Sequence, residues 1–413
     1  MISILIVEDN QDKYRAICSE LLNIDGVDSE NIYHAADIIS AKRFLKNQRF
    51  SLLLLDLNLP NRMGDDEEKM SGIKLLEFIT NNTKAIPPSY ILGMTAYDEA
   101  LIESQSEYAS VIWQVIKFDF SSSSWKENLI NSVRYLVSTD IPPYINDGRT
   151  YHTDIGIVCA LEEELESVLE QSDSYERFEI KYDQNIYYKL TYNIDERQLT
   201  AIAVSCPQMG MSTSGVIAQH IISKFRPRIL AMAGICAGIK EKVNYGDVLI
   251  AEPCFEWGGG KLIENENNEL ELKHAPYPWR IDSTVKNILR IIKNDQDFFN
   301  EIHKNFLLSS ESTPTDIPKL KIGAMASGSS VLQSQKMIDF IKKQHKDLIG
   351  IEMESYSVFT ASQLADEPKP ICVSIKSVCD FGDPSKNDNY HKFAAYTSAA
   401  TLTRFIKDWF KKN

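Results

Sequence analysis

The sequence has no long hydrophobic run and no excess of basic residues. Its apolar stretches stay well short of the roughly 20 residues that a membrane-spanning helix needs, so we expect no membrane partner. Lys and Arg total 44 against 58 Asp and Glu, which gives a formal net charge of −14. Broad binding to nucleic-acid backbones requires a basic surface, so nucleic acid is not an expected partner either.

Cysteine is also scarce. The seven cysteines are scattered, form no CxxC pair and are odd in number, which argues against a disulfide framework or a cysteine-based zinc site. The first residues, "MISILIVEDN", lack the basic leader and the small-residue cleavage site of a signal peptide. We therefore expect a cytoplasmic protein with reduced thiols.

Two segments of the chain open in the same way. "ISILIVEDN" (2–10) and "DIGIVCALEEE" (154–164) are each a short apolar run that ends in acids and precedes an amphipathic helical stretch. A buried parallel strand that opens an α/β domain has this pattern. Residues 138–154 hold paired prolines, a glycine and little apolar periodicity, as a linker does. The predicted organisation is a first domain, a linker and a second domain: 1–139, 140–152 and 153–413.

The first domain is predicted to be a doubly wound parallel sheet. Helical spacing separates its apolar segments, and alternating strands and helices favour a parallel sheet with helices on both faces. Ligands of such sheets bind at the carboxyl ends of the strands. The predicted strands are 2–7, 51–55, 90–94 and 111–116.

Polar residues stand at the end of each of these strands. Glu8 and Asp9 follow the first strand and Asp56 follows the second. Three acids that converge at one edge repel each other, and Mg²⁺ is the hard cation that suits oxygen ligands. Asp56 is then placed to attack a phosphoryl group, while Thr95 and Lys117, at the ends of the last two strands, stabilise the added charge. Each acid alone is more often a solvated loop residue; the combination points to a phosphorylation site.

Segment 1–137 resembles the receiver domain of two-component response regulators, which has a CheY-like, flavodoxin-like fold. "ILIVEDN", "LLLLDLNLP", "MTA" and a lysine occur in the family's order and spacing. The resemblance implies that Asp56 is the phosphoacceptor and that a histidine kinase or a histidine phosphotransfer protein is the phosphodonor. It also implies roles for the other strand-end residues. The implied Mg²⁺ ligands are Glu8, Asp9, Asp56 and the backbone carbonyl of Asn58, and the implied switch pair is Thr95 and Lys117.

The segment departs from the receiver pattern at three places. Phe118 follows the lysine where the family usually has proline, and Gln114, next to Trp113, stands at the position of the switch aromatic. An acidic insertion, "NRMGDDEEKM" (61–70), lengthens the loop after the phosphoacceptor. We interpret it as a solvated loop, with recognition of a phosphodonor as the alternative.

The second domain is predicted to be a larger α/β domain with a mixed sheet. The small residues of "AMAGICAGI" (231–239), which include Gly234, predict a turn where the backbone approaches a ligand closely. The predicted strands are 154–159, 199–204, 228–233, 246–250, 320–325, 348–352 and 371–377.

Three carboxylates from distant segments of this domain suit one chemistry. Glu164 follows the first strand, Glu354 lies in "IEMES", and Asp380 ends the last strand. Cleavage of a purine N-glycosidic bond needs an acid to protonate the base, a carboxylate to activate water and a group to hold the ribose as it becomes cationic. For any one of these acids, a salt-bridged structural role is the more common one. Glu352, two residues before Glu354, is interpreted as structural.

Segment 153–413 resembles the nucleoside phosphorylase/nucleosidase superfamily, and within it the methylthioadenosine/S-adenosylhomocysteine nucleosidases, with an insertion around 258–315. The resemblance implies that Glu164 activates water, that Asp380 is the general acid, and that Glu354 binds the ribose hydroxyls with Met353 packed against the sugar. It implies no cofactor for glycosidic cleavage. Both families that the chain resembles often assemble, so we expect a homo-oligomer.

Other positions bear on the reaction and the substrate. The backbone near Val331 and Leu332 is expected to read the base edge, although Val331 stands where the family has a stacking aromatic. Cys379 replaces a serine before the general acid. Phosphorylases of the family bind phosphate with arginines, and Met232 occupies one of those positions, so hydrolysis is favoured over phosphorolysis.

The fusion of these two segments resembles the effectors of the Detocs anti-phage defence system. That resemblance implies a phosphorelay-controlled enzyme that hydrolyses ATP to adenine and ribose-5′-triphosphate during infection. A triphosphate requires cations at the 5′ end of the pocket. The candidates are Lys240, Lys261, Arg280 and Lys376.

Two other functions are compatible with the same residues. One is a constitutive nucleosidase for methylthioadenosine or S-adenosylhomocysteine, with the first domain as a dimerisation module. The other is a catalytically silent signalling protein that only binds nucleotide. The presence of all three acids of the second domain argues against the silent protein, and Asp56 with Lys117 argues against a first domain without a signalling role.

Overall fold

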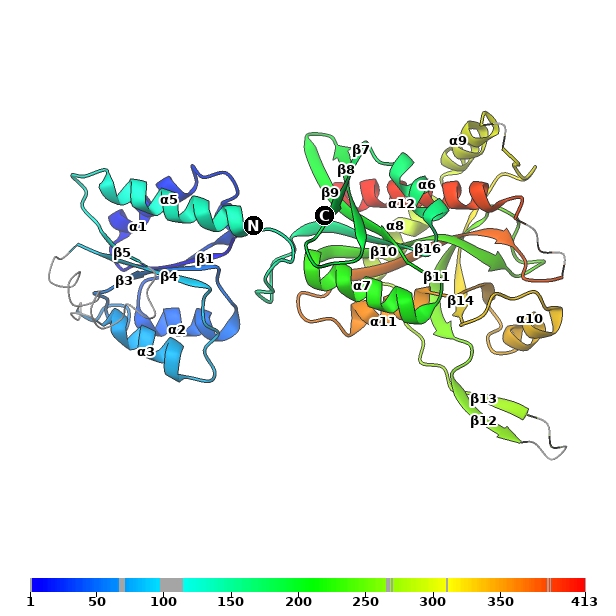
Figure 1. Cartoon of the computed structure of the whole chain (residues 1–413), viewed down its shortest axis with the longest axis horizontal. Coiled ribbons are helices and arrows are strands. Elements are labelled where there is room, and N and C mark those ends of the chain that lie inside the picture. The colour runs from blue at the N-terminus through cyan, green and yellow to red at the C-terminus, as the bar shows by residue number, and fades with distance from the viewer. Residues whose placement is uncertain are drawn as a thin grey trace. The chain divides into compact units, whose positions relative to one another are not determined.

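A computed structural model describes residues 2–66, 71–96, 114–264, 268, 270–309, 311–384, 386 and 388–412. The chain forms two compact units, Met1–Thr150 and Tyr151–Asn413 (Figure 1). Each unit is described separately below. Among the described residues, every helix is too short or too polar to span a lipid bilayer.

The first unit contains the predicted parallel sheet. Its five strands lie in the order β2-β1-β3-β4-β5, which is the order of flavodoxin-like doubly wound sheets. The strands are β1 (Ile4–Val7), β2 (Ile32–Ala35), β3 (Leu52–Asp56), β4 (Tyr90–Thr95) and β5 (Gln114–Lys117). The helices are α1 (Gln11–Leu21), the 3₁₀ helix η1 (Ser29–Asn31), α2 (Ile38–Asn47), α3 (Gly72–Asn81) and α5 (Ser124–Thr139). Helices α1 and α5 cover one face of the sheet, and α2 and α3 cover the other (Figure 1).

The apolar run "LLLLD" shows why this sheet is buried on both faces. Leu53 and Leu55 of β3 belong to the core under α2 and α3, whereas Leu52 and Leu54 belong to the core under α1 and α5. Successive side chains of a strand point to opposite faces, so a strand covered on both sides needs an unbroken apolar run. Strand β2 was not predicted because its four residues are mostly half-buried and carry no such run.

Two sequence predictions in this unit fall partly outside the described residues. The strand predicted at 111–116 is described only from Gln114, so Trp113 is not described. The acidic insertion at 61–70 is described only as far as residue 66.

The second unit is built on a mixed sheet, as predicted, but the sheet has nine strands where seven were predicted. The strand order is β15-β14-β11-β16-β10-β6-β9-β8-β7, and an additional pairing of β15 with β10 closes the first five of these strands into a ring. The strands are β6 (Thr153–Cys159), β7 (Ser174–Glu179), β8 (Ile186–Ile194), β9 (Arg197–Ser205), β10 (Pro227–Gly238), β11 (Val248–Glu256), β14 (Leu320–Ser327), β15 (Leu348–Glu352) and β16 (Ile371–Asp380). A separate hairpin consists of β12 (Gly260–Glu264) and β13 (Leu270–His274).

Helices pack against both sides of this sheet (Figure 1). The longest, α12, lies across β10 and β16 and buries small residues such as Ala394, Ser398 and Ala399 against them. The helices are α6 (Glu162–Glu170), α7 (Met211–Phe225), α8 (Ser283–Lys293), α9 (Gln296–Leu307), α10 (Gln335–Lys342), α11 (Ser355–Gln363) and α12 (His391–Lys412).

The prediction of a turn at "AMAGICAGI" was wrong. Residues 231–238 lie inside the twelve-residue strand β10, and Ala231–Gly234 pair in register with Val373–Lys376 of β16. Small residues fit in this strand because β10 is central in the sheet. It has β6 and β16 beside it and helices packed over its faces, which leaves little room for large side chains. Strand β7 was missed because nearly all of its residues are exposed.

Candidate active site

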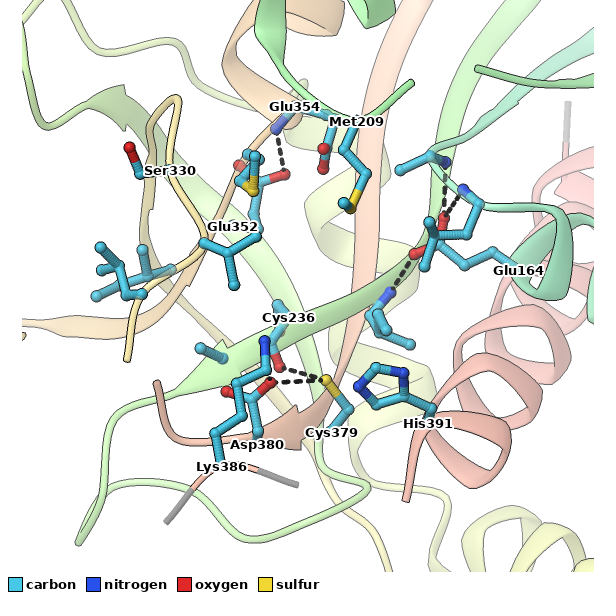
Figure 2. A pocket seen from close by; sticks show the side chains of 18 residues that line it. Glu164, Met209, Cys236, Ser330, Glu352, Glu354, Cys379, Asp380, Lys386 and His391 are labelled. Carbon is cyan, nitrogen blue, oxygen red and sulfur yellow. Dashed lines mark hydrogen bonds and ion pairs between the residues drawn. The ribbon is translucent and has the colours of Figure 1, made fainter. Parts of the chain in front are cut away.

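A cavity of about 330 Å³ lies where β10, β15 and β16 approach the start of α6 (Figure 2). This volume is at the lower end of the range for small-molecule sites. Six of the sequence-predicted residues line it: Glu164, Val331, Leu332, Met353, Glu354 and Asp380. The three carboxylates come from three separate segments of the chain, with Glu164 far before Glu354 and Asp380, and the fold brings them to one cavity.

Glu164 is buried and held by backbone N–H groups. One carboxylate oxygen, Oε2, accepts hydrogen bonds from the N–H of Ala160 at 2.6 Å and of Leu161 at 3.0 Å. The other, Oε1, accepts from the N–H of Ile235 in β10 at 2.7 Å. Three such donors fix the orientation of the carboxylate.

Gly234 makes room for this carboxylate. A Cβ added at Gly234 would lie 2.0 Å from Oε1 and 2.4 Å from Cδ of Glu164, which is far inside van der Waals contact. The N–H of Gly234 donates to Oγ of Ser398 in α12 at 2.9 Å. Gly234 itself does not line the cavity, and the group next to its backbone is Glu164; its role in ligand binding stays a prediction.

Lys376 of β16 is fully buried beside two of the acids. Its Nζ lies 3.5 Å from Oε2 of Glu354 and 3.8 Å from Oε1 of Glu164. Burial alone would lower the pKa of Lys376, but the attraction of Glu164 and then of Glu354 outweighs it, so the pKa is raised and the lysine is charged. One ammonium therefore neutralises part of the charge of both carboxylates.

Glu354 directly precedes helix α11. Its Oε1 accepts a hydrogen bond from the N–H of Gly210 at 2.9 Å, and its side chain is buried. Burial raises the pKa of Glu354 to about 7, although Lys376 opposes this shift. Glu354 is thus a carboxylate that changes charge near neutral pH.

Glu352 caps the helix that Glu354 precedes. Its Oε2 accepts from the N–H of Glu354 at 2.9 Å and from the N–H of Ser355 at 2.8 Å, and its Oε1 accepts from the hydroxyl of Ser327. Carboxylates are favoured at helix N-termini because they satisfy the free N–H groups there. Glu352 therefore has a structural role.

Asp380 ends β16 on another side of the cavity. Its Oδ1 accepts from the N–H of Gly382 at 2.7 Å, and its Oδ2 lies 3.1 Å from Nζ of Lys386. Burial raises the pKa of the Cys379 thiol well above its usual value, so this thiol stays protonated and donates to Oδ2 at 3.4 Å. Asp380, Cys379 and Lys386 lie together in Figure 2.

Sequence reasoning missed Lys386, His391 and Met209, which also line the cavity. Lys386 lies in an irregular loop and His391 at the start of α12, where no periodic pattern marks a side chain as inward-facing. Their closeness to Asp380 in the chain is the signal that was available.

None of the four cations proposed for a triphosphate lines the cavity within the described part of the chain. Lys240 pairs with Asp383 at 2.5 Å, and Arg280 pairs with Glu252 at 3.1 Å. Lys261 is on the β12–β13 hairpin, and Lys376 lies behind the carboxylates.

The first unit brings its strand-end acids together at the edge of its sheet. Carboxylate oxygens of Glu8, Asp9 and Asp56 lie within 4.8 Å of one another, and this oxygen set fits Mg²⁺. Thr95 and Lys117 face each other in the register of β4 and β5. The backbone N–H of Asn58 donates to Oδ1 of Asp56 at 3.0 Å.

Sequence reasoning missed a cation in this acid cluster. Nζ of Lys13 lies 2.6 Å from Oδ2 of Asp56 and 2.8 Å from Oε2 of Glu8, and the side chain is buried. The signal was present: the buried stripe of α1 consists of Lys13, Ile17 and Leu21, so a lysine occupies a position with the spacing of core residues.

Lys376→Met should destabilise the second unit by about 3–5 kcal/mol, because it leaves two buried carboxylates without their cation. Urea denaturation measures this loss. Lys189→Met is the matched control, since Lys189 is also a strand lysine paired with a glutamate, Glu176, but is half exposed. The control should change the free energy of unfolding by less than about 1 kcal/mol. Equal effects of the two substitutions would show that the buried carboxylates do not need Lys376.

Comparisons with known proteins find relatives that match all or part of this chain. The uncharacterized protein y4jS of Sinorhizobium fredii is 30% identical over 405 residues, which cover 96% of this chain and 97% of that protein. The ATP nucleosidase Cap17 of Escherichia coli is 24% identical over 216 residues, 51% of this chain, and the match spans only 42% of Cap17. The 5′-methylthioadenosine/S-adenosylhomocysteine nucleosidase of Oceanobacillus iheyensis is 18% identical over 61% of this chain and 98% of its own length.

Two solved structures from Helicobacter pylori match part of the chain. Its 5′-methylthioadenosine/S-adenosyl homocysteine nucleosidase superposes with a TM-score of 0.48 at 19% identity, covering 62% of this chain and 99% of that one. Its futalosine hydrolase gives 0.47 at 20% identity, covering 62% and 97%. The family model of the phosphorylase superfamily matches residues 154–411, which is more than half of the chain. The chain therefore belongs to the phosphorylase superfamily.

Proposed function

We propose that the second unit is an N-glycosidase that hydrolyses purine nucleotides, with ATP as its preferred substrate and adenine and ribose-5′-triphosphate as products. One observation carries the proposal: Glu164, Glu354 and Asp380 line a single cavity together with the apolar side chain of Met353. A base-protonating acid, a water-activating base and a ribose-binding carboxylate are the groups that this reaction requires.

The proposed reaction balances without a cofactor. Asp380 donates a proton to a ring nitrogen of the purine as the C1′–N bond breaks, so the base leaves as a neutral molecule. Glu164 takes a proton from water while the water oxygen forms the new bond to C1′. Glu354 accepts hydrogen bonds from the ribose hydroxyls, which matters most as positive charge develops on the sugar.

Hydrolysis is favoured over phosphorolysis by the walls of the cavity. Among the described residues that line it there is no arginine, and Met232 is fully buried inside β10 and does not reach it. The carboxylate of Glu164 repels a phosphate anion but activates water. ATP is proposed as the substrate because the relative Cap17 is an ATP nucleosidase. Methylthioadenosine is the competing substrate, because other relatives are methylthioadenosine/S-adenosylhomocysteine nucleosidases.

We further propose that the first unit is a receiver domain that controls this activity in a cytoplasmic homo-oligomer. Asp56 would accept a phosphoryl group from a histidine kinase or histidine phosphotransfer protein, with Mg²⁺ bound by Glu8, Asp9, Asp56 and the carbonyl of Asn58. The flavodoxin-like strand order, the acid cluster and the pairing of Thr95 with Lys117 support this assignment. The proposed setting is anti-phage defence, in which phosphotransfer during infection switches on destruction of ATP.

Free adenine is the product that tests the enzyme. The purified chain is incubated with ATP, AMP, adenosine or methylthioadenosine, each with and without acetyl phosphate, and adenine is measured by chromatography. We expect adenine from ATP, with a higher rate when acetyl phosphate is present. Release from methylthioadenosine alone, independent of acetyl phosphate, would establish a methylthioadenosine nucleosidase. No release from any substrate would establish a catalytically silent protein.

Gly234→Ala should lower kcat for adenine release at least about 100-fold, because the new methyl group displaces the Glu164 carboxylate and a mispositioned general base loses most of its effect. The substitution should leave KM within a few-fold, since Gly234 does not line the cavity. The matched control is Gly258→Ala, where the space around the added Cβ is open to 4 Å. A fully active Gly234→Ala enzyme with native circular dichroism would contradict the role of Glu164.

The pH dependence of kcat/KM should report Glu354. Its pKa is raised to about 7, so its ionised fraction falls as the pH drops below 7. The ionised carboxylate accepts hydrogen bonds from the ribose hydroxyls more strongly than the protonated form does, so kcat/KM should fall by up to about tenfold per pH unit below pH 7. Glu354→Gln should be less active and should lack this acidic limb. A wild-type profile that is flat between pH 5 and pH 7 would remove Glu354 from this role.

Asp56→Asn should uncouple the two units. The variant keeps every residue of the cavity, so its adenine release without acetyl phosphate should equal that of the wild type. Acetyl phosphate should no longer change its rate, because the amide cannot accept the phosphoryl group. Stimulation of the variant equal to that of the wild type would refute control through Asp56.

A further inference from the structure

Lys13 in the first unit is a buried lysine that contacts two carboxylates outside the cavity. This lysine lies on α1, whose N-cap residue Asn10 accepts hydrogen bonds from the backbone N–H of Asp12 and of Lys13 itself. The cap fixes the start of the helix and so directs the Lys13 side chain toward the sheet. Its Nζ reaches the two buried or half-buried carboxylates of Glu8 and Asp56 at once.

A second feature surrounds the same ammonium group. Nζ of Lys13 lies 5.4 Å from the ring centroid of Phe118, within the range of a cation–π interaction. Phe118 is buried and packs against Trp125, with ring centroids 4.6 Å apart. Phe118, which takes the place of the proline that usually follows the lysine in receiver domains, therefore lies against the ammonium group of Lys13.

The contacts of Lys13 overlap with those that a divalent cation would make. Glu8, Asp9 and Asp56 offer their oxygens within 4.8 Å of one another, and Mg²⁺ binds oxygen at about 2.0–2.1 Å. An ion bound to Glu8 and Asp56 would thus lie a few ångströms from Nζ, where two positive charges in a partly buried site repel strongly. Lys13 and such an ion would therefore compete for the same two carboxylates.

We propose that Lys13 is a tethered counter-ion of the acid cluster, and that a divalent cation binds there only when it displaces the Lys13 ammonium from Glu8 and Asp56. The flexible four-carbon stem of lysine allows this movement. In this arrangement the first unit is stable without metal, and its affinity for metal is set by how tightly Lys13 is held.

A consequence for Asp56 rests on the proposed function of this unit. Oδ2 of Asp56 is engaged by Lys13 at 2.6 Å. If Asp56 is the phosphoacceptor, the metal has a second task besides neutralising the phosphoryl group: it frees the attacking oxygen from the lysine. Phosphorylation of Asp56 should then require a higher Mg²⁺ concentration in the wild type than in a variant without Lys13.

The test is titration of the purified full chain with MgCl₂ by isothermal calorimetry. Lys13→Met, which keeps the length and apolar stem of the side chain, should bind Mg²⁺ at least tenfold more tightly than the wild type. Asp56→Asn in the Lys13→Met background should abolish that gain, which places the ion in the acid cluster. Lys126→Met is the matched control: Lys126 pairs with Glu20 at 2.6 Å in the same unit, and its loss should leave the Mg²⁺ affinity unchanged.

Thermal unfolding provides a second measurement that needs no calorimetry. Mg²⁺ should raise the Tm of Lys13→Met more than that of the wild type, because the ion replaces the lost ammonium. If Lys13→Met does not fold, Lys13→Gln takes its place, since the amide is neutral but still donates a hydrogen bond to Asp56. Mg²⁺ affinity that is unchanged or weaker in the folded variant would overturn the proposal.

Phosphorylation by acetyl phosphate, followed by mass spectrometry, separates this inference from the proposed receiver function. Tighter Mg²⁺ binding by Lys13→Met without phosphorylation of Asp56 in either protein would support the counter-ion and refute the receiver. Phosphorylated Asp56 with equal Mg²⁺ affinities in the two proteins would support the receiver and refute the counter-ion.

Discussion

The candidate active site depends on the buried ammonium of Lys376. Glu164 and Glu354 are both nearly inaccessible to water, and two such carboxylates repel each other unless a cation lies near both. Lys376 can serve both because β16 is a central strand, flanked by β10 and β11. The remaining oxygens of the acids are held by backbone N–H groups, so the orientation of the site is built from the main chain of the sheet and the helix N-termini around it.

The two units use a similar device with different contacts. In the first unit Lys13 makes direct hydrogen-bonded ion pairs with Glu8 and Asp56, at 2.8 and 2.6 Å. In the second unit Lys376 lies 3.5 and 3.8 Å from its two glutamates, which leaves its attraction mainly electrostatic. In the first case the lysine engages the oxygen that is proposed to react. In the second unit Lys376 does not line the cavity, so the two glutamates remain accessible from the cavity while the lysine neutralises them as a permanent counter-ion.

Local sequence patterns predicted the residues of both sites that lie at the ends of strands. Asp56 and Asp380 each close an apolar run, and Glu164 begins a helix just after one, so simple strand assignments place them at the edges of sheets. Lys376 was harder to interpret because it lies within a strand, where the pattern cannot tell a surface lysine from one that faces two acids. Gly234 was wrongly assigned to a turn because a run of small residues is typical of turns. Such a run also suits a strand that passes close to a buried carboxylate, and the sequence does not distinguish the two cases.

The sequence by itself determined the class of each unit and which acids were available, because apolar runs, helical spacing and strand-end residues are local properties of the chain. Only the tertiary structure decided which of those acids meet, which lysines neutralise them, and which glycine makes room for them. These facts depend on strand order: Glu164, Gly234 and Lys376 act together because β6, β10 and β16 are neighbours in the sheet, although they are far apart in the chain. Long-range neighbours of this kind arise from packing and leave no periodic trace in the residues themselves.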